Sequence, residues 1–96
     1  MKILALAKIL PDVTPEKIQQ LMKVETAKAW EFYTAGVFRE MYIRTDFPSA
    51  VLMLECANVE AAREVLAELP MVEENLIDFD LIPLGPFGCL SQLFAD

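Results

Sequence analysis

The most informative absence in this 96-residue chain is histidine, which does not occur at all. Its absence removes haem held by a proximal histidine, Ser-His catalytic pairs and histidine acid–base chemistry, and it leaves most zinc sites without their usual ligand. Any catalysis must therefore use carboxylates, tyrosines, arginine, lysine or thiols.

Cysteine is scarce as well, with Cys56 and Cys89 the only two. They lack the CxxC spacing of redox and zinc motifs, and they are too few for a disulfide-stabilised domain. Neither has a basic neighbour in sequence that would activate it as a nucleophile. We interpret both as reduced, buried small side chains of a cytoplasmic protein.

Basic residues and long apolar runs are also few. Eight Lys and Arg stand against 15 Asp and Glu, for a net charge of −7, so the chain is not expected to bind nucleic acid, whose binders cluster Lys and Arg. The apolar start is interrupted at Lys8 and ends at Pro11. It is far shorter than the roughly 20 residues of a membrane span, so no membrane association is expected.

Apolar residues, in contrast, are abundant for a chain of this length. They make up 55% of the sequence, and the mean hydropathy is +0.37. Ninety-six residues form one domain, which buries roughly 60–65% of the surface of its unfolded chain. So small a domain cannot enclose this much apolar material, and we expect a homodimer or higher homo-oligomer.

The order of elements predicts the fold class. Apolar runs and helix signals, including Thr14 before Pro15 at the start of the first helix and Gly36 after its end, give the order β-α-β-β-α-β. The expected strands are 2–9, 37–44, 50–56 and 76–84, and the expected helices are 15–35 and 59–69, with a possible short turn of helix at 71–75.

This order is that of the α+β, ferredoxin-like split βαβ fold, with both helices on one face of a four-stranded antiparallel sheet. The strands are apolar on both faces, so the uncovered face needs a second sheet, as in a dimeric α+β barrel. We therefore expect one ferredoxin-like domain at 1–84. The apolar tail at 85–96 is expected to pack on a neighbouring subunit.

Glu25 is the residue of greatest functional interest. At 100° per residue it falls in the middle of an apolar stripe on the first helix, made of Ile18, Leu21, Met22, Ala29, Phe32 and Tyr33. A carboxylate there must be paired, hydrogen-bonded or protonated. It can act as a general base with a raised pKa, or it can serve the structure by pairing with Arg39 or a lysine.

The segment after the first helix carries a family resemblance. It reads Gly36-Val37-Phe38-Arg39-Glu40-Met41-Tyr42. This segment resembles the Gly-x-Trp-Arg-x-x-Trp segment of muconolactone delta-isomerases. The Glu25 helix, the order of elements and the later Leu69-Pro70-Met71 also resemble that family. The Gly and Arg match, two aromatic residues differ, and the resemblance covers about residues 2–84.

The resemblance implies a cofactor-free, metal-free isomerase that moves a proton on an unsaturated lactone or related small carboxylate in aromatic catabolism. Glu25 then matches the family's helix glutamate, the general base, and Arg39 its strand arginine, an anion anchor. Where the family carries a histidine after that arginine, this chain has Glu40. On the residues alone, Arg39 is equally suited to a salt bridge with Glu25 or Glu55.

Further candidate residues are aromatic or acidic. Trp30, Tyr33, Tyr42 and Phe47 are interpreted as a substrate-binding lining for a flat ring, or as core and interface packing. Asp78 and Asp80 alternate on the last strand but lack a third ligand, so we interpret them as a solvated face and not as a metal site.

Two other functions fit the same architecture. One is a dimeric-barrel monooxygenase or cyclase acting on polyketide-like aromatic substrates, which a wide aromatic cavity without an anion-binding arginine would favour. The other is a non-catalytic ligand-binding or assembly dimer. It would be favoured by a Glu25 engaged in a structural contact with no cavity beside it.

Overall fold

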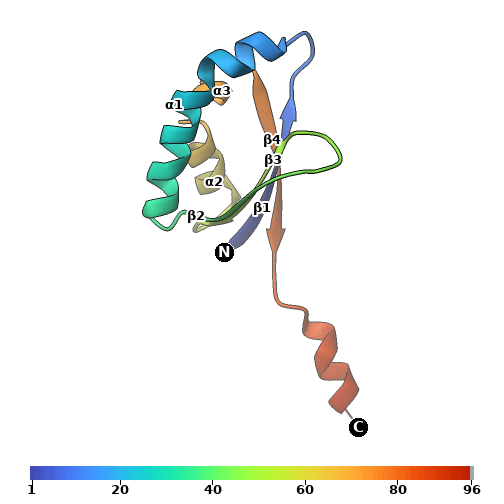
Figure 1. The fold of residues 1–96 in the computed structure, drawn as a ribbon. Coiled ribbons are helices and arrows are strands. Elements are labelled where there is room, and N and C mark those ends of the chain that lie inside the picture. The colour runs from blue at the N-terminus through green and yellow to red at the C-terminus, as the bar shows by residue number, and fades with distance from the viewer. Residues whose placement is uncertain (96) are drawn as a thin grey trace.

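A computed structural model describes residues 1–95 and shows an α+β fold built on one antiparallel sheet (Figure 1). Its strands lie in the order β2-β3-β1-β4. The predicted ferredoxin-like architecture is confirmed. The elements are β1 (Lys2–Ile9), α1 (Pro15–Thr34), β2 (Phe38–Ile43), β3 (Ala50–Glu55), α2 (Val59–Leu66), α3 (Pro70–Glu73), β4 (Ile77–Leu84) and a 3₁₀ helix, η1 (Gly88–Phe94).

The central strand β1 shows why the sheet has one covered and one open face. Ile3, Ala5 and Ala7 are buried against the helices, which all lie on one side of the sheet (Figure 1). Leu4 and Leu6, which alternate with them, point to the opposite face. The strand pairs antiparallel with both β3 and β4, so its apolar side chains form the middle of both faces.

The core lies between the sheet and the helices. Phe38, Ile3, Leu54 and Leu69 are its largest fully buried side chains. The rings of Phe32 on α1 and Phe38 on β2 pack with centroids 5.2 Å apart. These contacts hold the C-terminal half of α1 onto the sheet.

Local sequence sets both ends of α1. The Thr14 hydroxyl accepts from the backbone N–H of Lys17, and Pro15 occupies the first turn, where no amide donor is needed. Gly36 ends the helix with φ of +79°, the left-handed conformation that the sequence predicts. The N–H of Val37 then donates to the carbonyl of Phe32 at 2.9 Å, which closes the last turn.

The apolar stripe of α1 is narrower than the sequence predicts. Ile18, Leu21 and Phe32 are partly buried on the core, but Met22 is 41% and Tyr33 44% exposed. These two side chains point from the flank of the helix, beside the face that packs on β2 and α3. Helical periodicity places a residue around the axis, but it does not show how wide the covering surface is.

The second helical region also differs from prediction. Helix α2 ends at Leu66, with Ala67 as its C-cap, before the predicted end at Leu69. Leu69 instead precedes α3, whose first turn begins at Pro70. Proline is common in the first turn of a helix and strongly disfavoured in the interior, so Pro70 begins α3 and does not simply terminate α2.

The open face of the sheet is apolar in its middle. Cross-strand pairs place Leu6 beside Val51, and Leu4 between Met53 and Ile82, all on this face. Two ion pairs lie at the ends of this band, Lys8–Asp80 at 2.8 Å and the amino terminus of Met1 with Glu55 at 2.5 Å. The apolar side chains between these two ion pairs face solvent in the single chain.

Beyond β4, the segment 85–95 leaves the body of the protein (Figure 1). None of the residues in η1 is buried. The radius of gyration is 15.7 Å, whereas a compact chain of this length has one of about 12.5 Å. Residue 96 of the predicted tail lies outside the described residues.

Candidate functional site

Glu25 lies on the inner face of α1 and contacts the start of α3. Its Oε1 accepts a hydrogen bond from the backbone N–H of Met71 at 2.9 Å. The N-cap residue of α3, Leu69, has no side chain that can cap the helix. The carboxylate of Glu25, from another helix, therefore satisfies a first-turn donor of α3 that its own sequence leaves free.

The environment of Glu25 perturbs its protonation. Burial raises the pKa of the Glu25 carboxyl above its ordinary range, and the hydrogen bond from Met71 opposes this shift without cancelling it. The other oxygen of Glu25, Oε2, has no hydrogen-bond partner among residues 1–95. Every fully buried side-chain oxygen in these residues has a partner, so Oε2 is not fully buried. Oε2 therefore has some contact with solvent.

Arg39 occupies an irregular position on β2, where the register with β3 shifts between Phe38 and Glu40. Its Nε donates to the carbonyl of Gly36 at 2.5 Å. No hydrogen bond or ion pair links Arg39 to Glu25 within the described chain. Gly36 lies about 16 Å further along the helix axis than Glu25, so the single chain does not bring the guanidinium and the carboxylate together.

Trp30 and Tyr33 come together on the exposed flank of α1. Their rings stack with centroids 5.8 Å apart and an interplanar angle of 28°. Trp30 also borders a shallow depression, which we call the α1 hollow. It is lined by Gln19, Met22, Lys23, Thr26, Ala27 and Trp30.

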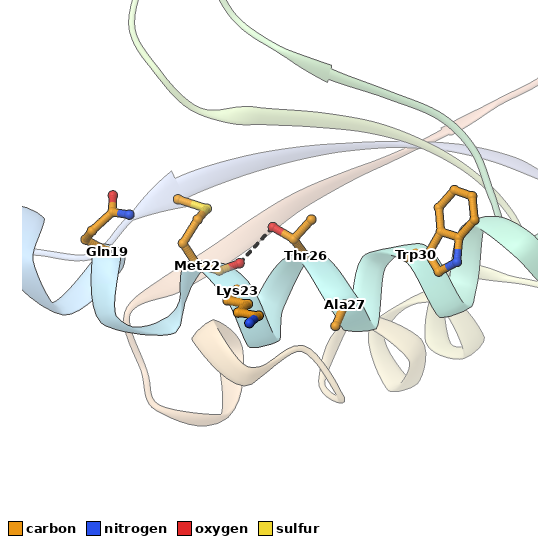
Figure 2. A pocket seen from close by; sticks show the side chains of 6 residues that line it. All are labelled: Gln19, Met22, Lys23, Thr26, Ala27 and Trp30. Carbon is orange, nitrogen blue, oxygen red and sulfur yellow. Dashed lines mark hydrogen bonds between the residues drawn. The ribbon is translucent and has the colours of Figure 1, made fainter.

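Figure 2 shows Met22, Thr26 and Trp30 projecting from the same side of α1. The Thr26 hydroxyl donates to the carbonyl of Met22 at 2.7 Å, which leaves its methyl group toward the hollow. Glu25 is not among the lining residues, because it points from the helix roughly 100° away from Thr26. The carboxylate and the hollow are therefore separate features of one helix.

The other two aromatic candidates lie elsewhere. Tyr42 pairs with Val51 on the open face of the sheet, where its hydroxyl donates to Glu40 at 2.6 Å. This hydrogen bond and the charge of Glu40 raise the pKa of Tyr42. Phe47, in the β2–β3 connection, lies under the guanidinium of Arg44 at 3.9 Å. One chain alone thus places the four aromatic candidates in three locations.

The cysteines and acidic residues complete the survey. Cys56 is half-buried, and burial raises the pKa of its thiol. Cys89 is exposed on η1, so the prediction that it is buried is wrong for the single chain. None of the residues in its 3₁₀ helix is buried. No group of three or more Cys, Asp or Glu side chains suited to a metal ion occurs within residues 1–95.

The sequence did not reveal that Met71 is the partner of Glu25, because the donor is a backbone amide. One signal was available. Leu69 and Pro70 begin a helix without a Ser, Thr, Asp or Asn at the N-cap, so the acceptor had to come from elsewhere in the fold.

Comparison with known proteins establishes the fold. The crystal structure of muconolactone isomerase superposes with a TM-score of 0.67 and 24% sequence identity, over 91% of this chain and 93% of that chain. The fold is that of muconolactone isomerase. The predicted resemblance is thereby confirmed at the level of structure. No protein-family profile matches the sequence, and no curated protein sequence matches it.

In the muconolactone isomerase fold as this chain adopts it, α1 carries both Glu25 and the hollow, and Arg39 follows directly after the turn at Gly36. None of the helices in residues 1–95 is long and apolar enough to cross a membrane.

Proposed function

We propose that this protein is a cofactor-free isomerase of the muconolactone isomerase type, which moves a proton on an unsaturated lactone or a related small carboxylate. Glu25 is the general base. The observation that carries the proposal is its half-buried carboxylate, which has a raised pKa and an Oε2 without a hydrogen-bond partner among residues 1–95, in a fold shared with muconolactone isomerase.

The proposed chemistry is a proton shift without oxidation or reduction. Oε2 of the Glu25 carboxylate takes a proton from a carbon activated by the lactone carbonyl, and the electron pair moves into an enolate. The neutral Glu25 then returns the proton to another carbon, which restores the carboxylate. A raised pKa suits the first step, because it makes the carboxylate a stronger base.

Arg39 is the proposed anchor for the carboxylate of the substrate. Only its Nε is engaged within residues 1–95, so the terminal guanidinium nitrogens can form a bidentate pair with an anion. The rise of about 16 Å between Glu25 and Gly36 requires the arginine to extend toward the base. Binding of the anion would draw it away from the carbonyl of Gly36.

We further propose that the protein is a homodimer or larger homo-oligomer whose sheets face each other. Leu4, Leu6, Val51 and Met53 lie on the open face, and only one side of the sheet is covered by helices. In a two-fold interface each patch meets its own copy, so unpaired like charges would repel. The pairing of Lys8 with Asp80 within each protomer reduces that repulsion.

The Glu25→Gln variant tests the chemistry, because the amide keeps the shape and the acceptor for Met71 but cannot take a proton. We expect turnover of muconolactone to fall about 10²–10⁴-fold, with the unfolding temperature unchanged or raised. Arg39→Lys should mainly raise KM. Turnover of Glu25→Gln within about tenfold of the wild type would contradict the mechanism.

One observation favours a second function, a non-catalytic ligand-binding or assembly dimer. The contact of Glu25 with Met71 is structural, and the α1 hollow does not include Glu25. On this reading, Glu25→Gln would change nothing but stability, and no lactone would be turned over by the wild type. The same assay therefore separates the two functions.

A further inference from the structure

A second hollow lies between the first half of α1 and the end of α3. We call it the α1–α3 groove. It has a volume of about 200 Å³ and is lined by Lys17, Gln20, Leu21, Glu74 and Leu76. Sites for drug-sized ligands enclose about 300–1,000 Å³, so the α1–α3 groove suits a smaller molecule.

The turn after α3 fixes one wall of the α1–α3 groove. The N–H of Asn75 donates to the carbonyl of Val72 at 3.0 Å, and the N–H of Leu76 donates to the carbonyl of Met71 at 2.8 Å. Asn75 has φ of +59°, a left-handed conformation that asparagine tolerates better than most residues. These features form a Schellman motif. It holds Glu74 and Leu76, on either side of Asn75, in the wall that faces α1.

The α1–α3 groove has an apolar floor and a charged rim. Leu76 is 6% exposed, and Leu21 is partly buried on the core. Lys17 and Glu74, which carry opposite charges, are exposed on the two walls. No ion pair within residues 1–95 involves either of them. The ammonium of Lys17 is therefore available to an anion that enters the groove.

Glu25 lies beside one end of the α1–α3 groove, although it is not a lining residue. Side chains on a helix lean toward its N-terminus, so the carboxylate of Glu25 leans toward Leu21, four residues and about 6 Å earlier. Met71, which donates to Glu25, lies in the first turn of α3, and Glu74 is the C-cap of that helix. Helices α1 and α3 contact each other (Figure 1). Glu25 and the groove therefore lie along one seam between them.

Lys17 and Arg39 lie on opposite sides of Glu25 along the axis of α1. Lys17 precedes Glu25 by eight residues, a rise of about 12 Å, and its flexible four-carbon stem can shorten that span. Gly36, whose carbonyl holds Nε of Arg39, lies about 16 Å beyond Glu25, on the side from which the carboxylate leans away. In the single chain, a small molecule held by Lys17 is therefore better placed to present a carbon atom to Glu25 than one held by Arg39.

We propose that the α1–α3 groove is a carboxylate-binding subsite of the proposed active centre. The ammonium of Lys17 and the side-chain amide of Gln20 hold the carboxylate of a small substrate, and its carbon skeleton extends along the seam toward Glu25. Glu74 on the facing wall repels a second acidic group, so the subsite selects monocarboxylates over dicarboxylates. The inference rests on the isomerase function proposed above, and it gives the substrate a nearer anchor than Arg39.

Steady-state kinetics of muconolactone turnover by the full chain test the subsite. Lys17→Met keeps a side chain of similar length but removes the ammonium, and it should raise KM about tenfold with little change in kcat. Glu74→Gln should lower KM about twofold, because it removes a repelling charge at an exposed position. Damage to the structure would not produce these opposite effects. Lys23→Met, which removes the same charge from another flank of α1, is the control and should leave KM unchanged.

Binding measured without turnover separates the subsite from the proposed function. In titration calorimetry, Glu25→Gln should bind muconolactone about tenfold more tightly than Glu25→Gln/Lys17→Met does. Binding that depends on Lys17, in a protein whose wild type turns over no lactone, would support the subsite and contradict the isomerase function. Turnover by the wild type with an unchanged KM in Lys17→Met would overturn the subsite alone. Equal affinities of the two proteins in calorimetry, or no binding to either, would overturn it as well.

Discussion

The carboxylate of Glu25 accepts a hydrogen bond from the backbone N–H of Met71, a residue 46 positions later in the chain. This contact joins α1 to the first turn of α3, which has no cap of its own. A group suited to proton transfer thus also supports the structure, and experiments on Glu25 must separate the two roles.

Comparison of two substitutions at Glu25 separates them. Glu25→Ala removes the acceptor for the Met71 amide, and Glu25→Gln retains one. We expect the alanine variant to be less stable than the glutamine variant by about 1–3 kcal/mol, the cost of a partly buried donor left without a partner. Urea denaturation at pH 7 measures the difference, and equal stabilities would show that the contact contributes nothing.

The stability of the protein should depend on pH through Glu25. Burial raises the pKa of this carboxyl in the folded state, so the folded protein holds the proton more tightly than the unfolded chain. The resulting stabilisation is fully present below the ordinary pKa near 4.5 and is lost as pH rises through the raised folded value. Glu25→Gln lacks this titration.

The wild type should therefore lose stability relative to Glu25→Gln as the pH rises from about 4 toward neutrality. Denaturation curves of both proteins at several pH values give the difference in the free energy of unfolding. A difference that stays constant across this range, or that changes in the opposite direction, would be inconsistent with the buried environment of Glu25.

Gly36→Ala should destabilise the protein by about 1 kcal/mol or more, because φ of +79° is unfavourable for alanine. Steric overlap should add little, since the nearest atom to an added Cβ is Nε of Arg39 at 3.9 Å. Gly85→Ala is the control, because its Cβ would meet nothing within 4 Å. Thermal unfolding of both variants should show a clearly larger effect at Gly36.

Phe38 should be among the most costly positions in the core. It is 1% exposed and packs on Phe32, so Phe38→Ala should cost about 3–5 kcal/mol through lost contacts and a cavity. Phe38→Leu, which keeps most of the volume, should cost less. Phe47→Ala is the exposed counterpart, and a cost similar to that of Phe38→Ala would refute this description of the core.

Charge on the open face should prevent association of the sheets. Met53 is partly exposed there and pairs with Leu4 across the strands. Met53→Glu would bury two carboxylates against each other in a two-fold interface, so we expect a dimer of the wild type to become a monomer in light scattering. Glu64→Gln, on α2, should leave the mass unchanged.

Much of the fold was predictable because local chemistry determined it. The limits of β1, the proline and threonine that begin α1, and the glycine that ends it follow from turn and capping preferences. The extent of the stripe on α1 was not predictable. Met22 and Tyr33 satisfy the same period as Leu21, but the covering surface ends before it reaches them.

The candidate site was predictable only residue by residue. Periodicity placed Glu25 on the inner face of α1, and its half-buried environment agrees with that placement. The partner of Glu25 is a backbone amide, which carries no signature in the sequence. The separation of Tyr42 and Phe47 from Trp30 depends on strand pairing and loop path, which aromatic composition does not specify.

The two edges of the sheet determine what kind of assembly the protein can form. Strand β2 carries a register irregularity beside Arg39, and β4 carries Pro83, which has no amide hydrogen to offer. Edges of this kind discourage the strand-by-strand addition that leads to fibres. Growth of the sheet by added strands is therefore disfavoured at both of its edges, which guards the protein against the kind of pairing that leads to amyloid.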